Sequence, residues 1–319
     1  MYRSPRRAPS RLRRFLVGAV GIALVGGMLT TAAIATDTFG AGHLWLRVVN
    51  RVERFMAGPV PDRPTIATVK VTEPPPDDTE SAPPDPTPTP TTTDAGESLA
   101  PTPEPTPTPT PKPKPKPVDV DIVRDPDKVF AHEIRPDWCA PAGVQMVLAI
   151  LGRANTSDAT QREIAGRVHE WEAYADSRNG EWGPAAMALA LDAYGAPGYE
   201  VRAFDTMTLA LRDAAAAIKK TRSPAILLAW RGAHTWVMTG YRASADPATF
   251  KKTDIKGAYI LDPWYPDVSS IWGRSNPPGF FTTFAELREN FLPWRRPEGR
   301  YKDRDGLFIT VVPTRPRPA

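Results

Sequence analysis

A proline-rich stretch over residues 59–117 constrains, more than any other feature, what this chain can fold into. It holds 20 of the chain's 38 prolines and no aromatic residue. Such a segment buries too little apolar surface to offset the entropy that ordering costs, so it cannot build a core. We therefore predict a disordered linker over 59–117, extended by its Thr-Pro and Lys-Pro alternation and acting as a spacer or cell-wall-crossing tether. A polyproline ligand for a binding domain is the alternative.

The positive charge of the chain is concentrated at its N-terminus. The formal net charge is +4, and the first 14 residues contain six arginines and no acidic residue. Residues 118–319 contain 26 basic and 25 acidic residues. A folded part with balanced charge lacks the basic surface of a nucleic-acid-binding domain, so we expect no nucleic-acid partner.

An apolar segment follows these arginines and indicates export. Residues 15–34 are 20 residues without a charge, enough to span a bilayer. The same segment fits a cleaved signal peptide, because residues 33–35 match a small-x-small cleavage site. We predict a basic flank with a transmembrane anchor or a signal peptide over 1–36. The rest of the chain is then extracytoplasmic on the cell membrane, or secreted.

Residues 37–58 carry the pattern of an amphipathic helix. Between His43 and Met56, apolar side chains recur on one side and arginines on the other. Two placements fit this pattern, one on the membrane surface and one packed against the folded domain.

Residues 118–319 are expected to form one domain, because they hold eight of the nine tryptophans and can build a sizeable core. Apolar spacing predicts a helix that starts near Cys139 and stops at Gly152, followed by helices over 158–170, 184–194 and 206–220. Strands are predicted over 199–204, 224–230, 235–241, 258–261 and 307–312. Helices first and strands afterwards favour an α+β fold with a mostly antiparallel sheet.

Cys139 is the only cysteine of the chain and precedes a run typical of a buried helix. Unpaired N–H groups and the helix dipole at a helix start favour the thiolate, the form that attacks a carbonyl carbon. No disulfide is possible within the chain, and an unpaired thiol in an exported protein suggests reactivity. A small buried apolar residue is the alternative interpretation.

A base for Cys139 has few candidates, since His132, His169 and His234 are the only histidines of the domain. His234 stands between two predicted strands, and Asp262 stands where another strand ends at a proline. Such an aspartate can fix the imidazole tautomer. One cysteine with scattered histidines gives poor support for a zinc site, so we predict no metal and no cofactor.

These residues carry a resemblance. The motifs over 138–141, 234–241 and 261–264, with turns over 180–184 and 192–195, resemble the papain-like cysteine peptidases related to bacteriocin-processing, double-glycine leader peptidases. The similarity spans roughly residues 130–312. It implies a papain-like fold with Cys139 as nucleophile, His234 as base and Asp262 as the residue that orients it.

Glu133 departs from this family's pattern. Papain-like enzymes usually carry a glutamine about six residues before the nucleophile, and its amide donates to the oxyanion. A carboxylate there would repel the developing negative charge unless it were protonated or turned away. We therefore expect Glu133→Gln to raise the rate of hydrolysis of a general peptide substrate, most clearly above the pH at which Glu133 ionises.

The sequence thus predicts an exported thiol hydrolase that cleaves peptide bonds through a thioester. Its substrate is a peptide or protein, with the cell wall as a further candidate partner. An aromatic cleft of Trp138, Trp182, Trp236 and Trp264 is predicted to hold that substrate. Two alternatives stay open: an idle papain-like module that binds peptide or wall polymer, and a cysteine-dependent acyltransferase or amidase.

Overall fold

The structure is a computed structural model that describes residues 58–61, 63, 65–72, 114–178 and 181–316. Six further residues are described between Trp45 and Met56. The predicted membrane segment and residues 73–113 of the predicted linker lie outside the described residues. None of the helices in the described part of the chain is both long and apolar enough to cross a membrane.

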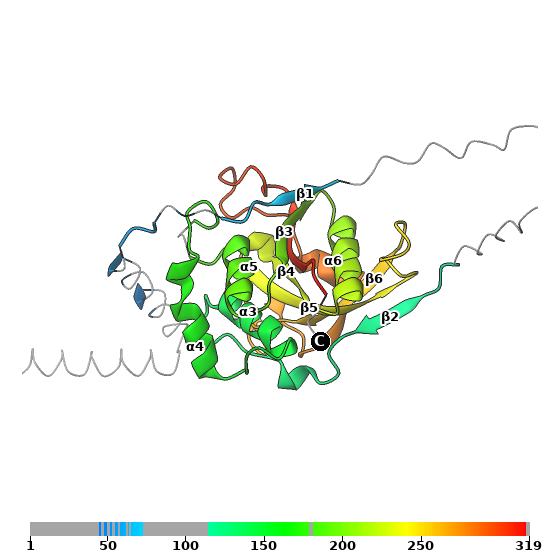
Figure 1. The fold of residues 1–319 in the computed structure, drawn as a ribbon, viewed down its shortest axis with the longest axis horizontal. Helices are drawn as coiled ribbons and strands as arrows, with labels where there is room; N and C mark the ends of the chain where they lie inside the picture. Colours follow the sequence, from blue (N-terminus) through cyan, green and yellow to red (C-terminus); the bar gives the residue numbers. More distant parts are fainter. Residues whose placement is uncertain are drawn as a thin grey trace, which may run out of the picture.

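A mostly antiparallel sheet forms the centre of the domain (Figure 1). Within the described residues its eight strands follow the order β1-β3-β10-β4-β5-β6-β9, and β2 also pairs with β5. The strands are β1 (Val69–Val71), β2 (Val118–Asp121), β3 (Tyr199–Phe204), β4 (Ala225–Ala229), β5 (His234–Ala243), β6 (Ile255–Leu261), β9 (Phe280–Thr283) and β10 (Phe308–Pro313). The pairing of β1 with β3 is parallel. A separate ribbon pairs β7 (Val268–Ser269) with β8 (Gly273–Arg274).

Helices cover both faces of this sheet, as Figure 1 shows. They are α3 (Cys139–Ile150), α4 (Asp158–Gly166), α5 (Pro184–Ala193), α6 (Met207–Thr221) and α7 (Phe284–Asn290), with the short 3-10 turns η2 (Pro126–Lys128), η3 (Val168–Glu170) and η4 (Trp230–Gly232). Ile226 and Leu228 point into the core beneath α3 and α5, whereas Leu227 points into the core beneath α6. Because both faces of β4 are buried, its sequence is an uninterrupted apolar run.

The close packing of α3 on β5 positions the chemistry. A Cβ atom added to Gly143 would overlap the side chain of Thr235, so only a glycine allows this approach of helix to strand. Cys139 is the first residue of α3 and His234 the first of β5. The approach therefore brings the two residues to the same end of the domain.

The predicted α+β class is confirmed, and all predicted helices and strands of the domain are present. The prediction over 158–170 is divided between α4 and η3. Sequence reasoning missed β9 and α7, although α7 begins with a readable capping box. There, Thr283 Oγ1 accepts from the Glu286 N–H at 3.3 Å, and the Glu286 carboxylate accepts from the Thr283 N–H at 2.6 Å.

Strand β1 lies inside the segment predicted as linker. It pairs with β3 at the edge of the sheet, Val69 opposite Arg202. Just before it, Thr68 Oγ1 accepts a hydrogen bond of 3.0 Å from the buried Arg304, and Val60 is also buried. The first part of the segment over 59–117 is thus joined to the domain. The overall composition of the segment did not reveal this strand, because prolines far outnumber the β-branched residues that form it.

The six described residues between Trp45 and Met56 are helical. Five of their apolar side chains are exposed: Trp45, Val48, Val52, Phe55 and Met56. Both placements of the predicted amphipathic helix, on the membrane surface and against the domain, stay predictions.

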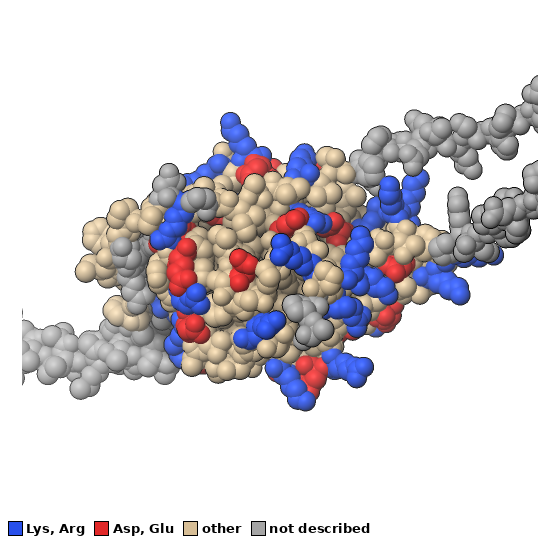
Figure 2. All heavy atoms as spheres, viewed as in Figure 1, with Lys and Arg blue, Asp and Glu red and all other residues tan. Residues whose placement is uncertain are grey.

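Charged side chains are mixed on the face of the molecule that Figure 2 shows. Lysine and arginine alternate there with aspartate and glutamate. Ion pairs neutralise some of the basic side chains of the domain. For example, a guanidinium nitrogen of Arg202 lies 2.9 Å from a carboxyl oxygen of Asp213, and one of Arg242 lies 2.9 Å from a carboxyl oxygen of Asp119. Basic side chains outnumber acidic ones on this face, and acidic side chains lie between them.

Candidate active site

Cys139 lies where the sequence predicts it, at the start of α3. Its Sγ lies 3.9 Å from the carbonyl oxygen of Ala233, the residue just before β5. Trp138 precedes it and Pro141 occupies the first turn, where no backbone donor is required. The thiol thus faces the neighbouring strand, and the free N–H groups of the first helical turn surround it.

His234 and Asp262 form a buried hydrogen-bonded pair. The distance from His234 Nε2 to Asp262 Oδ1 is 2.7 Å, and both side chains are almost completely buried. Antiparallel pairing of β5 with β6 brings the start of one strand beside the end of the other. Asp262 also accepts from the Trp264 N–H at 3.0 Å, which fixes its orientation.

Asp262 remains ionised. Burial opposes its charge, but the neighbouring His234 and the hydrogen bonds to the carboxylate outweigh burial and lower the pKa of Asp262 below its ordinary value. A carboxylate in this position holds the Nε2 proton of the imidazole and stabilises an imidazolium.

The imidazole of His234 also lies close to Cys139. Cys139 Sγ, one ring nitrogen of His234 and one carboxyl oxygen of Glu133 lie within 4.8 Å of one another. Because Nε2 is bonded to Asp262, Nδ1 is the nitrogen free to receive the thiol proton. Cysteine, histidine and aspartate are therefore brought together as the sequence predicts.

A strained turn supports His234 from behind. Trp230, Arg231 and Gly232 have positive φ values of 52°, 61° and 85°. Left-handed backbone is costly for the first two, and such strain tends to concentrate at functional sites. The indole of Trp230 stacks on the imidazole of His234 with centroids 3.8 Å apart. Sequence reasoning missed this role of Trp230, since a left-handed tryptophan leaves no recognisable pattern.

The thiol of Cys139 differs from the expectation of a ready thiolate. Burial raises the pKa of the Cys139 thiol above its ordinary value, and a negative charge on Glu133 adds to the effect. Hydrogen bonding with Thr235 lowers it only in part. The expectation from the helix start leaves out this effect of burial, which acts in the opposite direction on the thiol pKa.

Glu133 is buried, with 3% of its surface exposed. Neither carboxyl oxygen has a hydrogen-bond partner among the described residues. Burial, followed by the charges of Asp262, Asp137 and Asp267, raises the pKa of Glu133 to about 9. The group is therefore protonated near neutral pH. Of the two exceptions to repulsion named for Glu133, protonated or turned away, this raised pKa favours the protonated one near neutral pH.

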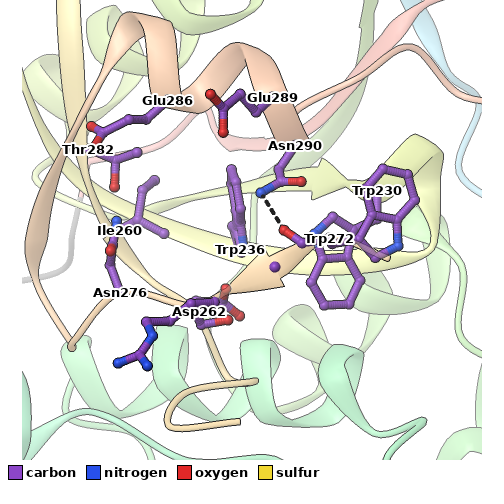
Figure 3. A pocket seen from close by; sticks show the side chains of 13 residues that line it. Trp230, Trp236, Ile260, Asp262, Trp272, Asn276, Thr282, Glu286, Glu289 and Asn290 are labelled. Atoms are coloured by element: carbon purple, nitrogen blue, oxygen red, sulfur yellow. Dashed lines mark hydrogen bonds between the residues drawn. The ribbon is translucent and has the colours of Figure 1, made fainter. Parts of the chain in front are cut away.

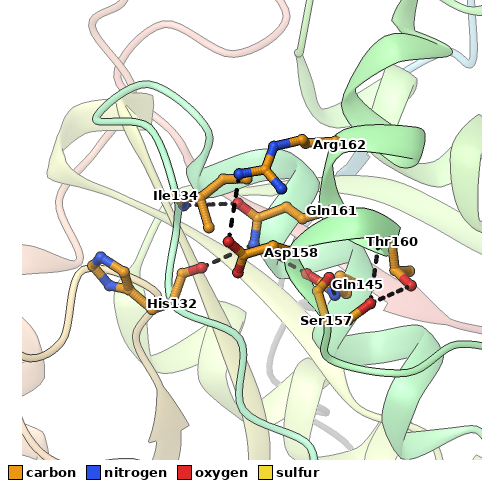
Figure 4. A network of polar contacts seen from close by, with 8 residues as sticks. All are labelled: His132, Ile134, Gln145, Ser157, Asp158, Thr160, Gln161 and Arg162. Carbon is orange, nitrogen blue, oxygen red and sulfur yellow. Dashed lines mark hydrogen bonds and ion pairs between the residues drawn. The ribbon is translucent and has the colours of Figure 1, made fainter.

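A network of amide side chains holds the segment that carries Glu133 (Figure 4). Gln161 donates to the His132 carbonyl at 2.9 Å and accepts from the Ile134 N–H at 2.9 Å. Gln145 accepts from Gln161 at 3.0 Å. Both peptide groups that flank Glu133 are thereby fixed to α4. None of these residues was predicted to act in the site, and no recognisable motif distinguishes them.

The predicted cleft tryptophans make different contacts. Trp182 packs on Trp171 in the core at 5.8 Å, and Trp138 lies under the guanidinium of Arg135 at 5.0 Å. Trp264 meets Trp230 edge-on at 5.9 Å. These contacts give no support to a single cleft lined by all four side chains, which stays a prediction.

Trp236 does line a pocket of about 160 Å³ behind the histidine and aspartate pair. Figure 3 shows this pocket between Trp230, Trp272 and the side chains of α7, with Asp262 at its edge. It lies beside the pair that serves Cys139, although Cys139 itself is not in its wall.

A metal ion would find three possible ligand groups close together in the described residues: Glu133, Cys139 and His234. A metal needs the carboxylate and the thiolate. Near neutral pH, however, Glu133 and Cys139 both hold their protons, since burial raises both pKa values. Metal binding at these three groups would therefore have to release the protons of Glu133 and Cys139.

Taken together, a thiol at a helix start, an imidazole on the adjoining strand and a buried carboxylate define the arrangement of a thiol hydrolase. The model of the peptidase C39-like family matches residues 119–290, which are 172 of the chain's 319 residues. The chain belongs to this family and is a hydrolase of the cysteine peptidase type. The family resemblance predicted from the sequence is confirmed.

The chain was also compared with solved structures and with curated proteins. One solved structure, a double-glycine motif protease from an AMS/PCAT transporter in complex with the leader peptide, matches 62% of this chain and 99% of its own. The match has 17% sequence identity and a TM-score of 0.28. No curated protein matches the chain.

Proposed function

We propose that the chain hydrolyses peptide bonds through a Cys139 thioester, with His234 as base and Asp262 as the residue that orients it. The observation that carries this proposal is the 2.7 Å bond between His234 and Asp262 beside the thiol of Cys139. It leaves one imidazole nitrogen free for the thiol proton. The substrate is a peptide or protein segment.

The proposed reaction begins with a neutral thiol. His234 Nδ1 takes the proton from Cys139 as Sγ attacks the carbonyl carbon, and the carbonyl electrons move to oxygen. The tetrahedral intermediate then collapses to a thioester, and the imidazolium gives its proton to the departing amine. Water, deprotonated by His234, cleaves the thioester and restores the thiol. Asp262 stays ionised throughout and stabilises the imidazolium.

The test combines labelling with substitution in the full chain. Cys139→Ala should abolish peptide cleavage, and His234→Ala should lower it by about 100-fold to 10,000-fold, the usual contribution of a general base. His169→Ala is the matched control, because His169 is an exposed histidine outside the site. Cleavage that survives Cys139→Ala would refute the proposal. Undiminished peptide binding without any cleavage by the wild type would favour the idle binding module.

We further propose that the domain acts outside the cytoplasm, on the cell membrane or after secretion. The arginine-flanked apolar segment over 15–34 supports this location. Fractionation tests it. An anchored protein stays with membranes after alkaline washing, whereas a soluble form that begins near residue 37 indicates a cleaved signal peptide. Recovery of the uncleaved chain in the cytoplasm would contradict both.

A further inference from the structure

Glu133 stands where the thiol hydrolase proposed above needs a hydrogen-bond donor for its oxyanion. We propose that Glu133 supplies that donor as a neutral carboxylic acid, and that its ionisation at alkaline pH switches the donor off. The backbone N–H of Cys139, at the start of α3, is the second donor. The inference rests on the proposed function and assigns Glu133 a catalytic role that a carboxylate could not perform.

The position of the carboxyl group supports this role. One oxygen of Glu133 lies within 4.8 Å of both Cys139 Sγ and a ring nitrogen of His234. A carbonyl carbon attacked by the sulfur therefore carries its oxygen within reach of Glu133. Both carboxyl oxygens are buried without a partner in the described residues, a costly state for a polar group. A bound oxyanion would supply a partner for the protonated oxygen.

The backbone holds this carboxyl group in place from two sides. On one side the Glu133 N–H donates to the carbonyl of Pro263 at 3.0 Å, directly after Asp262. On the other, Gln161 binds the peptide groups before and after Glu133 (Figure 4). A donor fixed in advance stabilises a developing charge without reorganisation in the transition state. Gln161 is thus a positioning residue for Glu133.

The groups around Glu133 keep its proton in place. Asp262 at the end of β6, Asp267 in the following loop and Asp137 before α3 all raise the pKa of Glu133, in addition to the larger effect of burial. Cys139 of α3 and His234 of β5 complete the titratable surroundings. With a pKa of about 9, Glu133 is an O–H donor at neutral pH and a carboxylate above that value.

Glu133 affects both the ionisation of the Cys139 thiol and the stability of the oxyanion. Comparing the acylation of this sulfur with its alkylation separates these two effects. p-Nitrophenyl acetate acylates Cys139 through a tetrahedral oxyanion, whereas iodoacetamide alkylates it without one. Both rates depend on the thiolate, so the ratio of acylation to alkylation isolates the oxyanion donor. The full chain is suitable, because Cys139 is its only thiol. Mass spectrometry locates the acyl group.

In the wild type the ratio should be constant near neutral pH and fall by about 100-fold or more above pH 9, the usual cost of one lost donor. Glu133→Gln keeps an N–H donor and should show no such fall. Glu133→Ala should have a low ratio at every pH. The fall in the wild type and its absence in Glu133→Gln together support the role.

Asp267→Asn provides a second, independent measurement. Asp267 is exposed, and its charge raises the pKa of Glu133. Its removal should therefore shift the fall of the ratio to lower pH in the wild type and change nothing in Glu133→Gln. An identical pH dependence in the wild type and Glu133→Gln would overturn the role of Glu133 while leaving the Cys139 nucleophile intact. Failure to find any acyl group on Cys139 would overturn both.

Discussion

At the scale of single residues, two opposite influences act on the proton of Cys139. The start of α3 favours the thiolate by the 0.3–1 kcal/mol or so that a helix dipole usually supplies. Burial raises the pKa of the Cys139 thiol instead, and it is the largest influence on that pKa. Removal of water can shift the pKa of a buried group by several units. The proposed attack would therefore depend on proton transfer to His234 rather than on a thiolate already present at rest.

We expect the alkylation rate of Cys139 in the folded protein to rise with pH and to have a midpoint above the ordinary thiol value of about 8.5. A raised pKa leaves fewer thiolates at neutral pH, so the folded protein should react more slowly there than the urea-unfolded chain. Iodoacetamide rates between pH 6 and pH 10 or so measure this, with the unfolded chain as control. A midpoint below 7 would show that a thiolate–imidazolium pair already exists at rest.

Glu133 should also make the stability of the fold depend on pH. Its pKa is about 9 in the folded protein and near 4.5 when unfolded. The unfolded state then loses the proton first, so the free energy of unfolding falls as pH rises from 4.5 toward 9. Glu133→Gln has no such loss. Its advantage over the wild type should grow with pH, to at most about 5 kcal/mol near pH 8.

Urea unfolding of the wild type and Glu133→Gln at several pH values between about 4 and 9 tests this dependence. The slope with pH decides the matter, rather than the absolute difference, because the substitution also changes hydrogen bonding. Equal slopes in the two proteins would mean that Glu133 is ionised in the folded state.

At the scale of elements, the contact of α3 with β5 sets the distance from sulfur to imidazole. Gly143 lies one turn after Cys139 and faces Thr235, the residue after His234. The interior has no spare volume at this contact, so the glycine determines how closely helix and strand approach. The geometry of the proposed site therefore depends on Gly143, which has no side chain and takes no part in the proposed reaction.

Gly143→Ala should separate α3 from β5 and damage both stability and catalysis. Overpacking of a buried contact typically costs about 1–3 kcal/mol. We expect a loss of that order in urea unfolding and slower acylation of Cys139. Gly166→Ala is the matched control, since a Cβ atom at the end of α4 meets no neighbour. Gly143→Ala that acylates as fast as the wild type would show that the site tolerates a shift of the helix.

The same contact separates what the sequence could predict from what it could not. Apolar periodicity located α3, β4 and β5, and with them Cys139 and His234, because burial leaves its period in the sequence. The Glu133 carboxyl was placed by resemblance, but its protonation depends first on burial and then on the charges of Asp262 and Asp267, and only the fold supplies these. The bonds from Gln161 to the backbone beside Glu133 follow no sequence pattern, because a glutamine side chain and a backbone peptide group can each form hydrogen bonds with many other groups.

At the scale of the whole molecule, β1 changes the meaning of the proline-rich stretch. Strand β1 pairs with β3 at the edge of the sheet, and β2 pairs with β5 in the same sheet. Residues 73–113, which connect β1 to β2, lie outside the described residues. Both ends of the intervening residues thus belong to one domain. The distance from the N-terminal segment to the domain is set by the residues before Val60, not by the length of the proline-rich stretch.

A fragment that begins at Val118 should be less stable than one that begins at Gly58. It lacks the pairing of β1 with β3 and leaves the buried Arg304 without its bond to Thr68. Loss of a partner by a buried group usually costs about 1–3 kcal/mol, and urea unfolding measures the difference. Replacing residues 74–113 by glycine and serine of equal length is the control and should be neutral. Equal stability of the two fragments would show that β1 adds nothing.

Strand β1 also determines what a proteolytic nick would do. A cut between residues 73 and 113 would leave a light chain that carries β1 and a heavy chain that carries Cys139, His234 and Asp262. The two would remain associated through the β1–β3 ladder and the Thr68–Arg304 bond. On a denaturing gel such a protein would look severed, while in solution it would migrate as a single particle with its chemistry intact.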